Sequence, residues 1–193
     1  MSNQKEKTHE GYLEKQILIA MPGMADPNFV RSVTLLCQHT DEGAIGITIN
    51  RKSHFTLGDI LAQLNIPCDD KQVSESLVLE GGPVNTDRGF VLHSPKEGFE
   101  SSLEITAGIM VTTSRDVLAA VARGEGPDQY VVALGYAGWG DGQLEWEMRE
   151  NAWLSVPVDS AIVFELPLKE RWKHAVSSLG VDIQHLHGVG GHA

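Results

Sequence analysis

Apolar positions recur along this chain with two different spacings, and each spacing predicts one kind of element. Short continuous apolar runs that end at turn residues are typical of buried strands, and such runs occupy residues 17–21, 33–39, 43–50, 77–80, 89–93, 109–113, 130–134, 153–158 and 162–164. Apolar residues three and four positions apart predict helices with one buried face, over residues 57–64, 114–123, 142–150 and 168–179. Because strands and helices are mixed throughout, we expect an α/β protein in which helices pack on a mixed sheet.

Capping residues support the predicted helix ends. Thr56, Ser114 and Asp141 each stand just before a helical pattern, where a side-chain oxygen accepts a bond from a free backbone N–H. Gly124 and Gly180 stand just after two of the patterns, where glycine commonly ends a helix. These signals predict that the helices begin and end close to the ranges given by the apolar spacing.

The length and composition indicate one folded domain. The chain has 193 residues, of which 41% are hydrophobic, so it is long enough to bury a core without disulfides or metals. Residues 1–12 are polar, and we expect them to form a flexible N-terminal segment. Residues 13–193 contain no internal repeat and no low-complexity linker, which predicts a single domain.

The charge and the cysteines narrow the class of protein. There are 26 acidic and 15 basic residues, for a net charge of −11, and a field of that sign repels nucleic acid and anionic membranes. The chain shows neither a signal peptide nor an apolar run of the roughly 18 residues that span a bilayer. Two cysteines, Cys37 and Cys68, are too few for a disulfide framework. We therefore expect a cytoplasmic protein with reduced thiols, no membrane association and no direct nucleic-acid partner.

A first glycine-rich segment, residues 81–93, is a candidate binding element. Gly82 and Pro83 turn the chain sharply after a predicted strand. Asp87 and Arg88 follow, and Arg88 has the geometry to bind a carboxylate or phosphate. The structural alternative is a local salt bridge between these two residues that closes the loop. Asn50, at the end of another predicted strand, has two interpretations as well: a turn residue or part of a polar rim.

A second glycine-rich segment, residues 135–145, leads from a predicted strand into a predicted helix. Such a loop can bind phosphate through its backbone N–H groups. The glycines do not match the dinucleotide pattern, because Gln143 occupies its last position, and no nucleotide P-loop is present. The alternative is that the glycines allow close backbone packing, with Trp139 in the core. We predict no cofactor here.

Other combinations of reactive residues give weaker signals. Cys37 and His39 are two positions apart on a predicted strand, so they would face the same side, as an activated nucleophile or two metal ligands. A buried cysteine is more often a small apolar side chain, and a zinc site needs further ligands. Glu145 has Arg149 four positions later, which is typical of a solvated helix face. We therefore predict no catalytic residue and no metal site.

The chain resembles the AlgH/YqgE family of bacterial proteins from about residue 17 to its end. The residues that carry the likeness include Ile19-Ala20-Met21-Pro22, Gly43-Ala44-Ile45-Gly46 with Asn50-Arg51, the segment 81–93, Leu134-Gly135-Tyr136-Ala137-Gly138-Trp139 and Asn151-Ala152-Trp153-Leu154. The resemblance implies a single-domain sandwich whose mixed, largely antiparallel sheet curls toward a partial barrel. It implies no cofactor, metal or agreed catalytic residue, and some members are labelled transcriptional regulators.

These observations favour a regulatory or protein-interaction module that binds through a shallow cleft and affects transcription indirectly, if at all. We expect the two glycine-rich segments to face each other across that cleft. The candidate binding residues are Asn50, Gly82, Pro83, Asp87, Arg88, Trp139 and Gln143, with an exposed Trp139 as the apolar floor. The partner would be another protein or a small molecule. The alternatives are a small-molecule enzyme that uses the same cleft and, less favoured by the acidic charge, a direct DNA-binding transcription factor.

Overall fold

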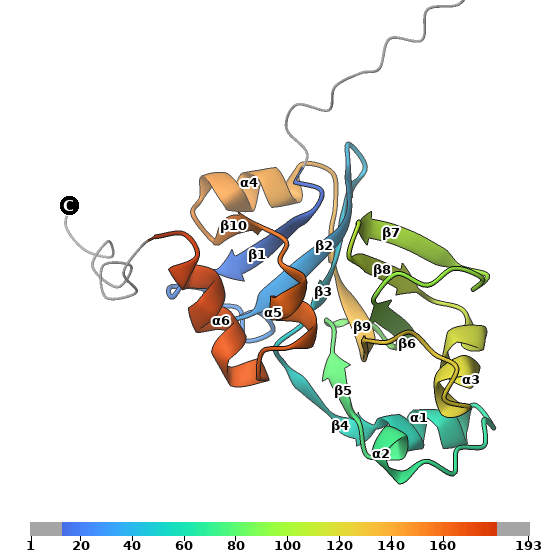
Figure 1. Cartoon of the computed structure of the whole chain (residues 1–193). Helices are drawn as coiled ribbons and strands as arrows, with labels where there is room; N and C mark the ends of the chain where they lie inside the picture. Colours follow the sequence, from blue (N-terminus) through green and yellow to red (C-terminus); the bar gives the residue numbers. More distant parts are fainter. Residues whose placement is uncertain (1–12, 181–193) are drawn as a thin grey trace, which may run out of the picture.

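The computed structural model describes residues 13–180, and over this range ten strands join one curled sheet (Figure 1). The strands are β1 (Gln16–Ala20), β2 (Val33–Thr40), β3 (Gly43–Thr48), β4 (Lys52–Thr56), β5 (Leu77–Glu80), β6 (Val84–His93), β7 (Ser102–Thr106), β8 (Ile109–Thr112), β9 (Tyr130–Trp139) and β10 (Trp153–Pro157). The helices are α1 (Leu57–Gln63), α2 (Lys71–Ser74), α3 (Arg115–Ala122), α4 (Gln143–Arg149), α5 (Ser160–Phe164) and α6 (Leu168–Ser177). The expected flexible segment 1–12 lies outside the described residues.

Strand β9 links the two halves of the sheet. The strand order is β10-β1-β2-β3-β9-β6-β8-β7, while β5 pairs with β9 and β4 pairs with β5. One edge of β9 is shared, because β5 pairs with its beginning and β3 pairs with its end. The β5–β9 pair is parallel and the other pairs are antiparallel. The predicted mixed, largely antiparallel sheet is therefore confirmed.

Three clusters of buried side chains fill the space between the sheet and the helices that pack on it. The largest, with Ile17, Ile47 and Leu92, lies on the concave face of the sheet beneath α5 and α6. A second, with Val78 and Val132, lies on the outer face of one half beneath α1 and α3. The third lies on the outer face of the other half beneath α4. Alternate residues of each strand therefore reach different clusters, as the two-residue period of a strand requires.

A glycine at position 135 shifts this alternation in the middle of β9. Gly135 has a φ of +73°, and a Cβ at this position would lie 2.4 Å from the Gly82 carbonyl oxygen. The β6–β9 register is also irregular between its pairs at Val84 and Gly89. Before the irregularity, Leu134 packs on the α1–α3 side; after it, Trp139 packs under α4. The same strand thus supplies the outer core of both halves.

The structure differs from the predicted elements in several places. Residues 162–164, predicted as a strand from Ile162 and Val163, lie in α5, because Asp159 caps that short helix by accepting a bond from the Ala161 N–H at 3.0 Å. Strands β4 and β7 and helix α2 were not predicted, since their sequences are polar and short. Thr56 caps α1 with a capping box as expected. Gly142, rather than Asp141, is the N-cap of α4.

Candidate functional site

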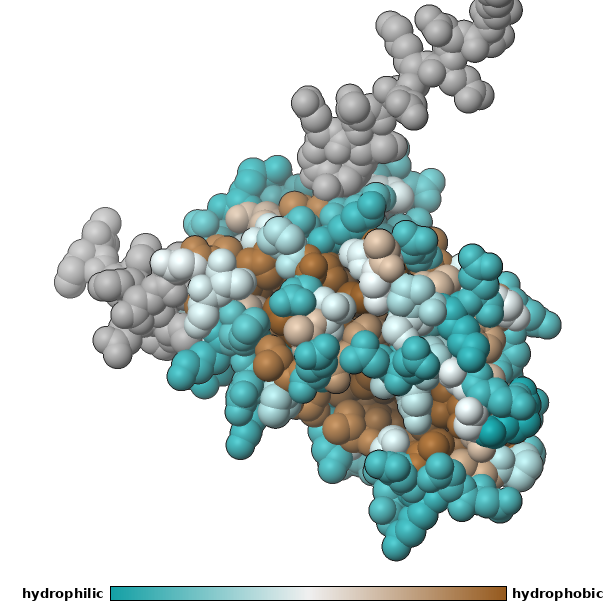
Figure 2. Space-filling view, viewed as in Figure 1, coloured by the Kyte–Doolittle hydropathy of each residue, from teal (hydrophilic) through white to brown (hydrophobic). Residues whose placement is uncertain are grey.

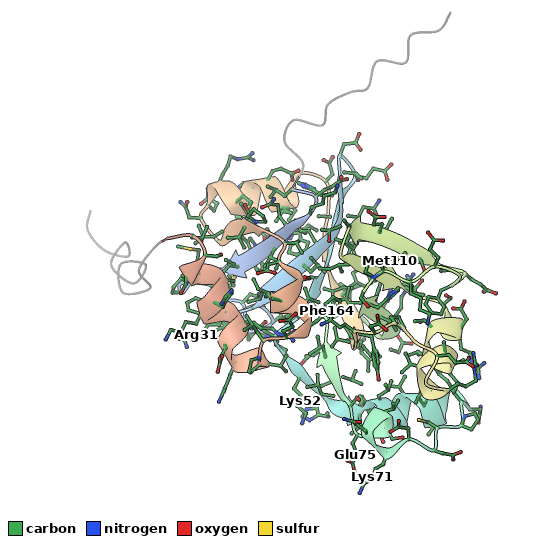
Figure 3. The ribbon with its side chains drawn as sticks, in the orientation of Figure 1. Arg31, Lys52, Lys71, Glu75, Met110 and Phe164 are labelled. Atoms are coloured by element: carbon green, nitrogen blue, oxygen red, sulfur yellow. The ribbon has the colours of Figure 1, made fainter. Side chains whose placement is uncertain are left out.

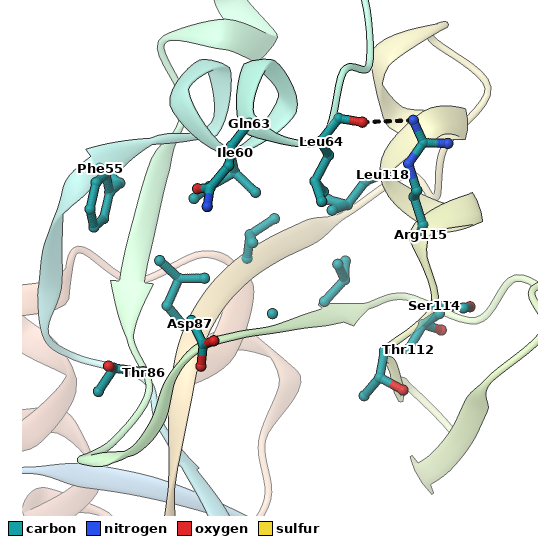
Figure 4. A pocket seen from close by; sticks show the side chains of 15 residues that line it. Phe55, Ile60, Gln63, Leu64, Thr86, Asp87, Thr112, Ser114, Arg115 and Leu118 are labelled. Carbon is teal, nitrogen blue, oxygen red and sulfur yellow. Dashed lines mark hydrogen bonds between the residues drawn. The ribbon is translucent and has the colours of Figure 1, made fainter.

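A cleft of about 420 Å³ lies between α1 and α3, and we call it the α1–α3 cleft (Figure 4). Strands β6 and β9 form its floor. Its apolar lining residues are Phe55, Ile60, Leu64, Val91, Leu118, Val132 and Leu134. These residues belong to or adjoin the apolar layer that α1 and α3 cover, so the cleft is a recess in that layer. On the side of the molecule that carries α5 and α6, Figure 2 shows apolar side chains near β5 with hydrophilic residues around them.

The floor of the cleft is buried and its rim is exposed. Val91 and Val132 are almost fully buried, in neighbouring strands of the sheet. The rim differs: Phe55 is 51% exposed and Leu64 is 37% exposed. Gly89 lies between floor and rim, and a Cβ added there would meet no atom within 4 Å. Apolar surface thus continues from the interior of the cleft to its mouth.

The Thr112 hydroxyl, which lines the cleft, is hydrogen-bonded to His93 and Ser102. His93 is fully buried, and its Nδ1 lies 2.8 Å from the Ser94 carbonyl, which only accepts, so Nδ1 carries the proton. His93 Nε2 therefore accepts from the Thr112 hydroxyl at 2.7 Å, and Thr112 Oγ1 in turn accepts from Ser102 at 2.6 Å. Burial lowers the pKa of His93 and so favours its neutral form. This hydrogen-bonded chain joins three strands, and Thr112 is fully buried within it.

The N-terminus of α3 forms the opposite wall and is also internally bonded. The Ser114 hydroxyl donates to the Asp116 carboxylate and accepts from the Ser101 N–H at 3.2 Å. Bonds from Ser114 and from backbone N–H groups stabilise the ionised carboxylate and lower the pKa of Asp116 against the opposing effect of desolvation. Arg115 Nη2 donates to the Leu64 carbonyl at 2.8 Å, which ties the end of α1 to the start of α3. These bonds hold the two walls in place.

Asp87 and Arg88 lie on opposite faces of β6. Asp87 lines the α1–α3 cleft, whereas the Arg88 guanidinium lies 5.4 Å from the centre of the Phe90 ring on the other face. The local salt bridge considered from the sequence is absent, because successive side chains of a strand point to opposite sides. Within the described part of the chain, Asp87 forms no ion pair.

The two glycine-rich segments lie side by side, in paired strands. Val84 pairs with Tyr136, and a Cβ on Gly82 would lie 2.1 Å from the Tyr136 carbonyl carbon. The second segment does not form a loop as far as Trp139, because β9 continues through it. A second hollow of about 500 Å³, open to solvent, is lined by Val84, Tyr136, Gly138 and Trp139 together with residues of β2 and β3. We call it the trough.

Trp139 is a core residue. It is 6% exposed, so the exposed indole expected from the sequence is wrong. Its Nε1 donates to Glu147 Oε2 at 3.0 Å, and Trp153 Nε1 donates to the same oxygen at 2.7 Å. Gln143 donates to the other oxygen of Glu147 at 2.9 Å. One carboxylate of α4 therefore holds two strands and the helix start together.

The remaining predicted site residues lie apart from the cleft. Asn50 accepts from the Val33 N–H and donates to the Arg31 carbonyl, both at 2.8 Å, and so fixes the loop before β2. Gly82 and Pro83 line a small hollow of about 10 Å³. Asn50, Arg88 and Gln143 line neither the cleft nor the trough. Of the seven candidates, Asp87 lines the α1–α3 cleft and Trp139 lines the trough.

A β-bulge separates Cys37 from His39. Leu36 pairs with Gly46 and Gln38 with Ile45, so Cys37 is the extra residue on β2 and the alternation of faces shifts there. Cys37 packs against the concave core, and burial raises the pKa of its thiol to about 12. His39 Nε2 instead bonds Glu145 Oε1 at 2.7 Å beneath α4. The two residues do not form a nucleophile pair, and the described residues contain no cluster of metal-binding side chains.

Sequence reasoning missed most of the cleft. Ile60 and Leu118 were assigned to apolar helix faces, but their helices lie on different segments of the chain, and the sequence gives no sign that they face each other across β6. Gly89 was counted only as part of a glycine-rich segment. An apolar face on each of two short helices, together with a glycine in the strand beneath them, is the signal that could have located this site.

A family model described as DUF179, AlgH-like, matches residues 17–184, so the chain belongs to the AlgH-like family. The resemblance seen in the sequence is thereby confirmed. A UPF0301 protein of Xanthomonas oryzae is 49% identical over 181 residues, which cover 94% of this chain and 96% of that protein. A UPF0301 protein of Xanthomonas euvesicatoria has the same identity and coverage.

Two solved structures share the fold. The solution structure of the AlgH protein from Pseudomonas aeruginosa is 44% identical, covers both chains completely and superposes with a TM-score of 0.79. The crystal structure of protein DIP2367 from Corynebacterium diphtheriae is 17% identical, covers 96% of this chain and 94% of its own, and has a TM-score of 0.72. The first supports the family and the fold, and the second supports the fold alone.

Proposed function

We propose that this protein is a cytoplasmic interaction protein that holds an apolar side chain of a partner protein in the α1–α3 cleft, with any effect on transcription being indirect. The observation that supports this is the cleft itself, with its buried apolar floor and its exposed apolar rim at Phe55 and Leu64. Recesses of roughly 300–1,000 Å³ with apolar linings are typical binding sites. Exposed apolar side chains that continue such a recess mark a surface for another molecule.

An enzyme that uses the same cleft is the competing proposal, and the polar groups there argue against it. A nucleophile needs a base within hydrogen-bond reach and a free path to substrate. Thr112 has a base in His93, but Thr112 is fully buried and so lacks a free path to substrate, and the Ser114 hydroxyl is bonded to the Asp116 carboxylate. The groups that line the cleft are therefore suited to holding its walls rather than to transferring protons.

Membranes and DNA are weaker candidates for the partner. Among the helices of residues 13–180, none has the length and hydropathy to cross a bilayer. The net charge of −11 repels phosphate backbones at long range. A protein partner is the occupant that an acidic surface with an apolar recess favours.

A variant that fills the cleft tests this proposal. Gly89→Leu adds a side chain on the cleft face of β6, where a Cβ meets open space, so the fold should tolerate it. Gly23→Leu is the matched control, because Gly23 also has open space at its Cβ and lies outside the cleft. Peptides selected from a displayed library should bind the native protein and Gly23→Leu but lose binding to Gly89→Leu by about tenfold or more, as expected when an apolar anchor is excluded.

Two results would count against the proposal. Selected peptides that bind Gly89→Leu as well as the native protein would place the interaction elsewhere on the molecule. A small metabolite that is chemically converted by the native protein, with the conversion lost in Gly89→Leu, would favour the enzyme instead.

A further inference from the structure

The mouth of the α1–α3 cleft carries a carboxylate without a cationic partner. Figure 4 shows Asp87 on the same side of the cleft as Phe55 and Gln63, with Arg115 and Ser114 on the other side. Within residues 13–180, no Lys, Arg or His pairs with Asp87. Asp87 is exposed, so its carboxylate is accessible to a cation on an incoming molecule, in an ion pair that solvent screens.

Nearby cations are held away from Asp87. Arg88 follows it in the chain but lies on the other face of β6, over the Phe90 ring. Arg115 donates to the Leu64 carbonyl across the cleft. Lys71 on α2 pairs with Glu75 at 3.6 Å on the outer surface (Figure 3). Within residues 13–180 the charge of Asp87 is therefore not neutralised by an ion pair, and neither is that of Arg115, which bonds only backbone carbonyls.

Phe55 adds a second feature that suits a cation. Its ring is 51% exposed on the rim, on the same side as Asp87. An ammonium or guanidinium group over an aromatic ring is attracted by the electron-rich face. The net charge of the whole chain, −11, also attracts basic partners at long range.

We infer that the partner segment that enters the α1–α3 cleft is basic: a Lys or Arg side chain pairs with Asp87 beside the apolar side chain that fills the cleft. This inference rests on the proposed function and specifies the chemistry of the partner. Arg115 sets the orientation of the bound segment. Its positive charge on the opposite wall repels the basic side chain of the partner, so that side chain is expected beside Asp87.

Short acetylated peptides with a central leucine test the inference. One carries flanking lysines, one glutamines and one glutamates, and their dissociation constants are measured by NMR titration of the full chain. The lysine peptide should bind about two- to fivefold more tightly than the glutamine peptide, as a partly exposed ion pair allows. Asp87→Asn should abolish this preference, and Asp87→Lys should shift it to the glutamate peptide. Asp141→Asn makes the same change of charge on an exposed loop residue outside the cleft, and should leave the preference unchanged.

The outcomes separate this inference from the proposed function. Peptides that bind equally well whatever their charge, yet are blocked by Gly89→Leu, would overturn the basic partner and keep the cleft as the binding site. Peptide binding that Gly89→Leu does not block, or no peptide binding at all, would overturn both. A simple alkylamine that binds as tightly as the lysine peptide and is blocked by Gly89→Leu would replace the protein partner with a small organic amine.

Discussion

At the scale of single residues, position on a strand decides what each reactive side chain does. The bulge at Cys37 sends the thiol into the concave core and His39 to the opposite face, beneath α4. The alternation of β6 places Asp87 in the cleft and Arg88 over Phe90. Residues that are close in the sequence therefore pack on opposite faces of the sheet.

The two thiols should differ strongly in reactivity. A pKa of about 12 instead of 9.0 leaves Cys37 with roughly a thousandfold less thiolate near neutral pH, and burial also limits access. Cys68 lies in a loop, with its thiol 3.6 Å from the Asp70 carbonyl. We expect a disulfide reagent to modify Cys68 first, measured by mass spectrometry on native protein. With Cys68→Ser, labelling should become slow until the protein unfolds; rapid labelling of Cys37 in that variant would contradict its burial.

His93 should make stability depend on pH. Its pKa is lowered in the folded state, so below about 6.5 the unfolded chain binds a proton that the folded chain does not. Stability should therefore be intact above that pH and fall as the pH decreases through it. His93→Gln keeps an acceptor for Thr112 and removes the titration, so it should reduce the difference between unfolding free energies at about pH 7 and pH 5. An unchanged difference in urea titrations would show that another group is responsible.

At the scale of elements, α4 is joined to the sheet through Glu147. This carboxylate accepts bonds from the indoles of Trp139 on β9 and Trp153 on β10, and the two rings meet edge to face with Phe29 beside them. Leu144 completes the buried face of the helix. The helix is thus held by the two indole bonds to Glu147 and by the His39–Glu145 bond, beside an apolar cluster.

Replacing two tryptophans of this region, one buried and one exposed, tests that arrangement. Trp139→Ala should lower the free energy of unfolding by roughly 3–5 kcal/mol, because it opens a cavity and leaves one bond of Glu147 unmade. Trp146→Ala, on α4 and 56% exposed, should change it by about 0.5 kcal/mol or less. Chemical denaturation of both variants measures the difference, and similar values for the two would argue against Trp139 as a core residue.

The sequence predicted the elements whose apolar pattern is strong and failed where the tertiary structure decides. Residues 77–80 and 153–158 were correctly predicted as strands because each is a short, largely apolar run with buried side chains, Val78 and Leu79 in the first and Trp153 and Val156 in the second. Strand β4 was missed because its residues are largely exposed and polar, and it exists through its pairing with β5. The glycines at 82 and 135 were recognised as part of unusual segments, but only the close approach of their backbones, where β6 pairs with β9, explains them. The cleft could not be predicted because it forms between segments that are far apart in the chain.

At the scale of the whole molecule, the acidic surface limits what the protein can approach. With a net charge of −11, we expect only weak DNA binding that decreases steeply with salt and does not depend on sequence. Fluorescence anisotropy with promoter and scrambled duplexes at about 0.15 M salt is the measurement. Nanomolar affinity for one sequence, the range of specific DNA-binding proteins, would contradict an indirect role in transcription.

The central claim is that the α1–α3 cleft binds an apolar side chain of a partner, and chemical-shift mapping tests it most directly. Titration of the native chain with the leucine-centred lysine peptide should shift the signals of Val91, Leu118 and Val132, which line the cleft. The same titration of Gly89→Leu should leave those signals in place, while Gly23→Leu should behave like the native chain. Shifts confined to the trough or to the surface of α4, or equal shifts in Gly89→Leu, would contradict the account.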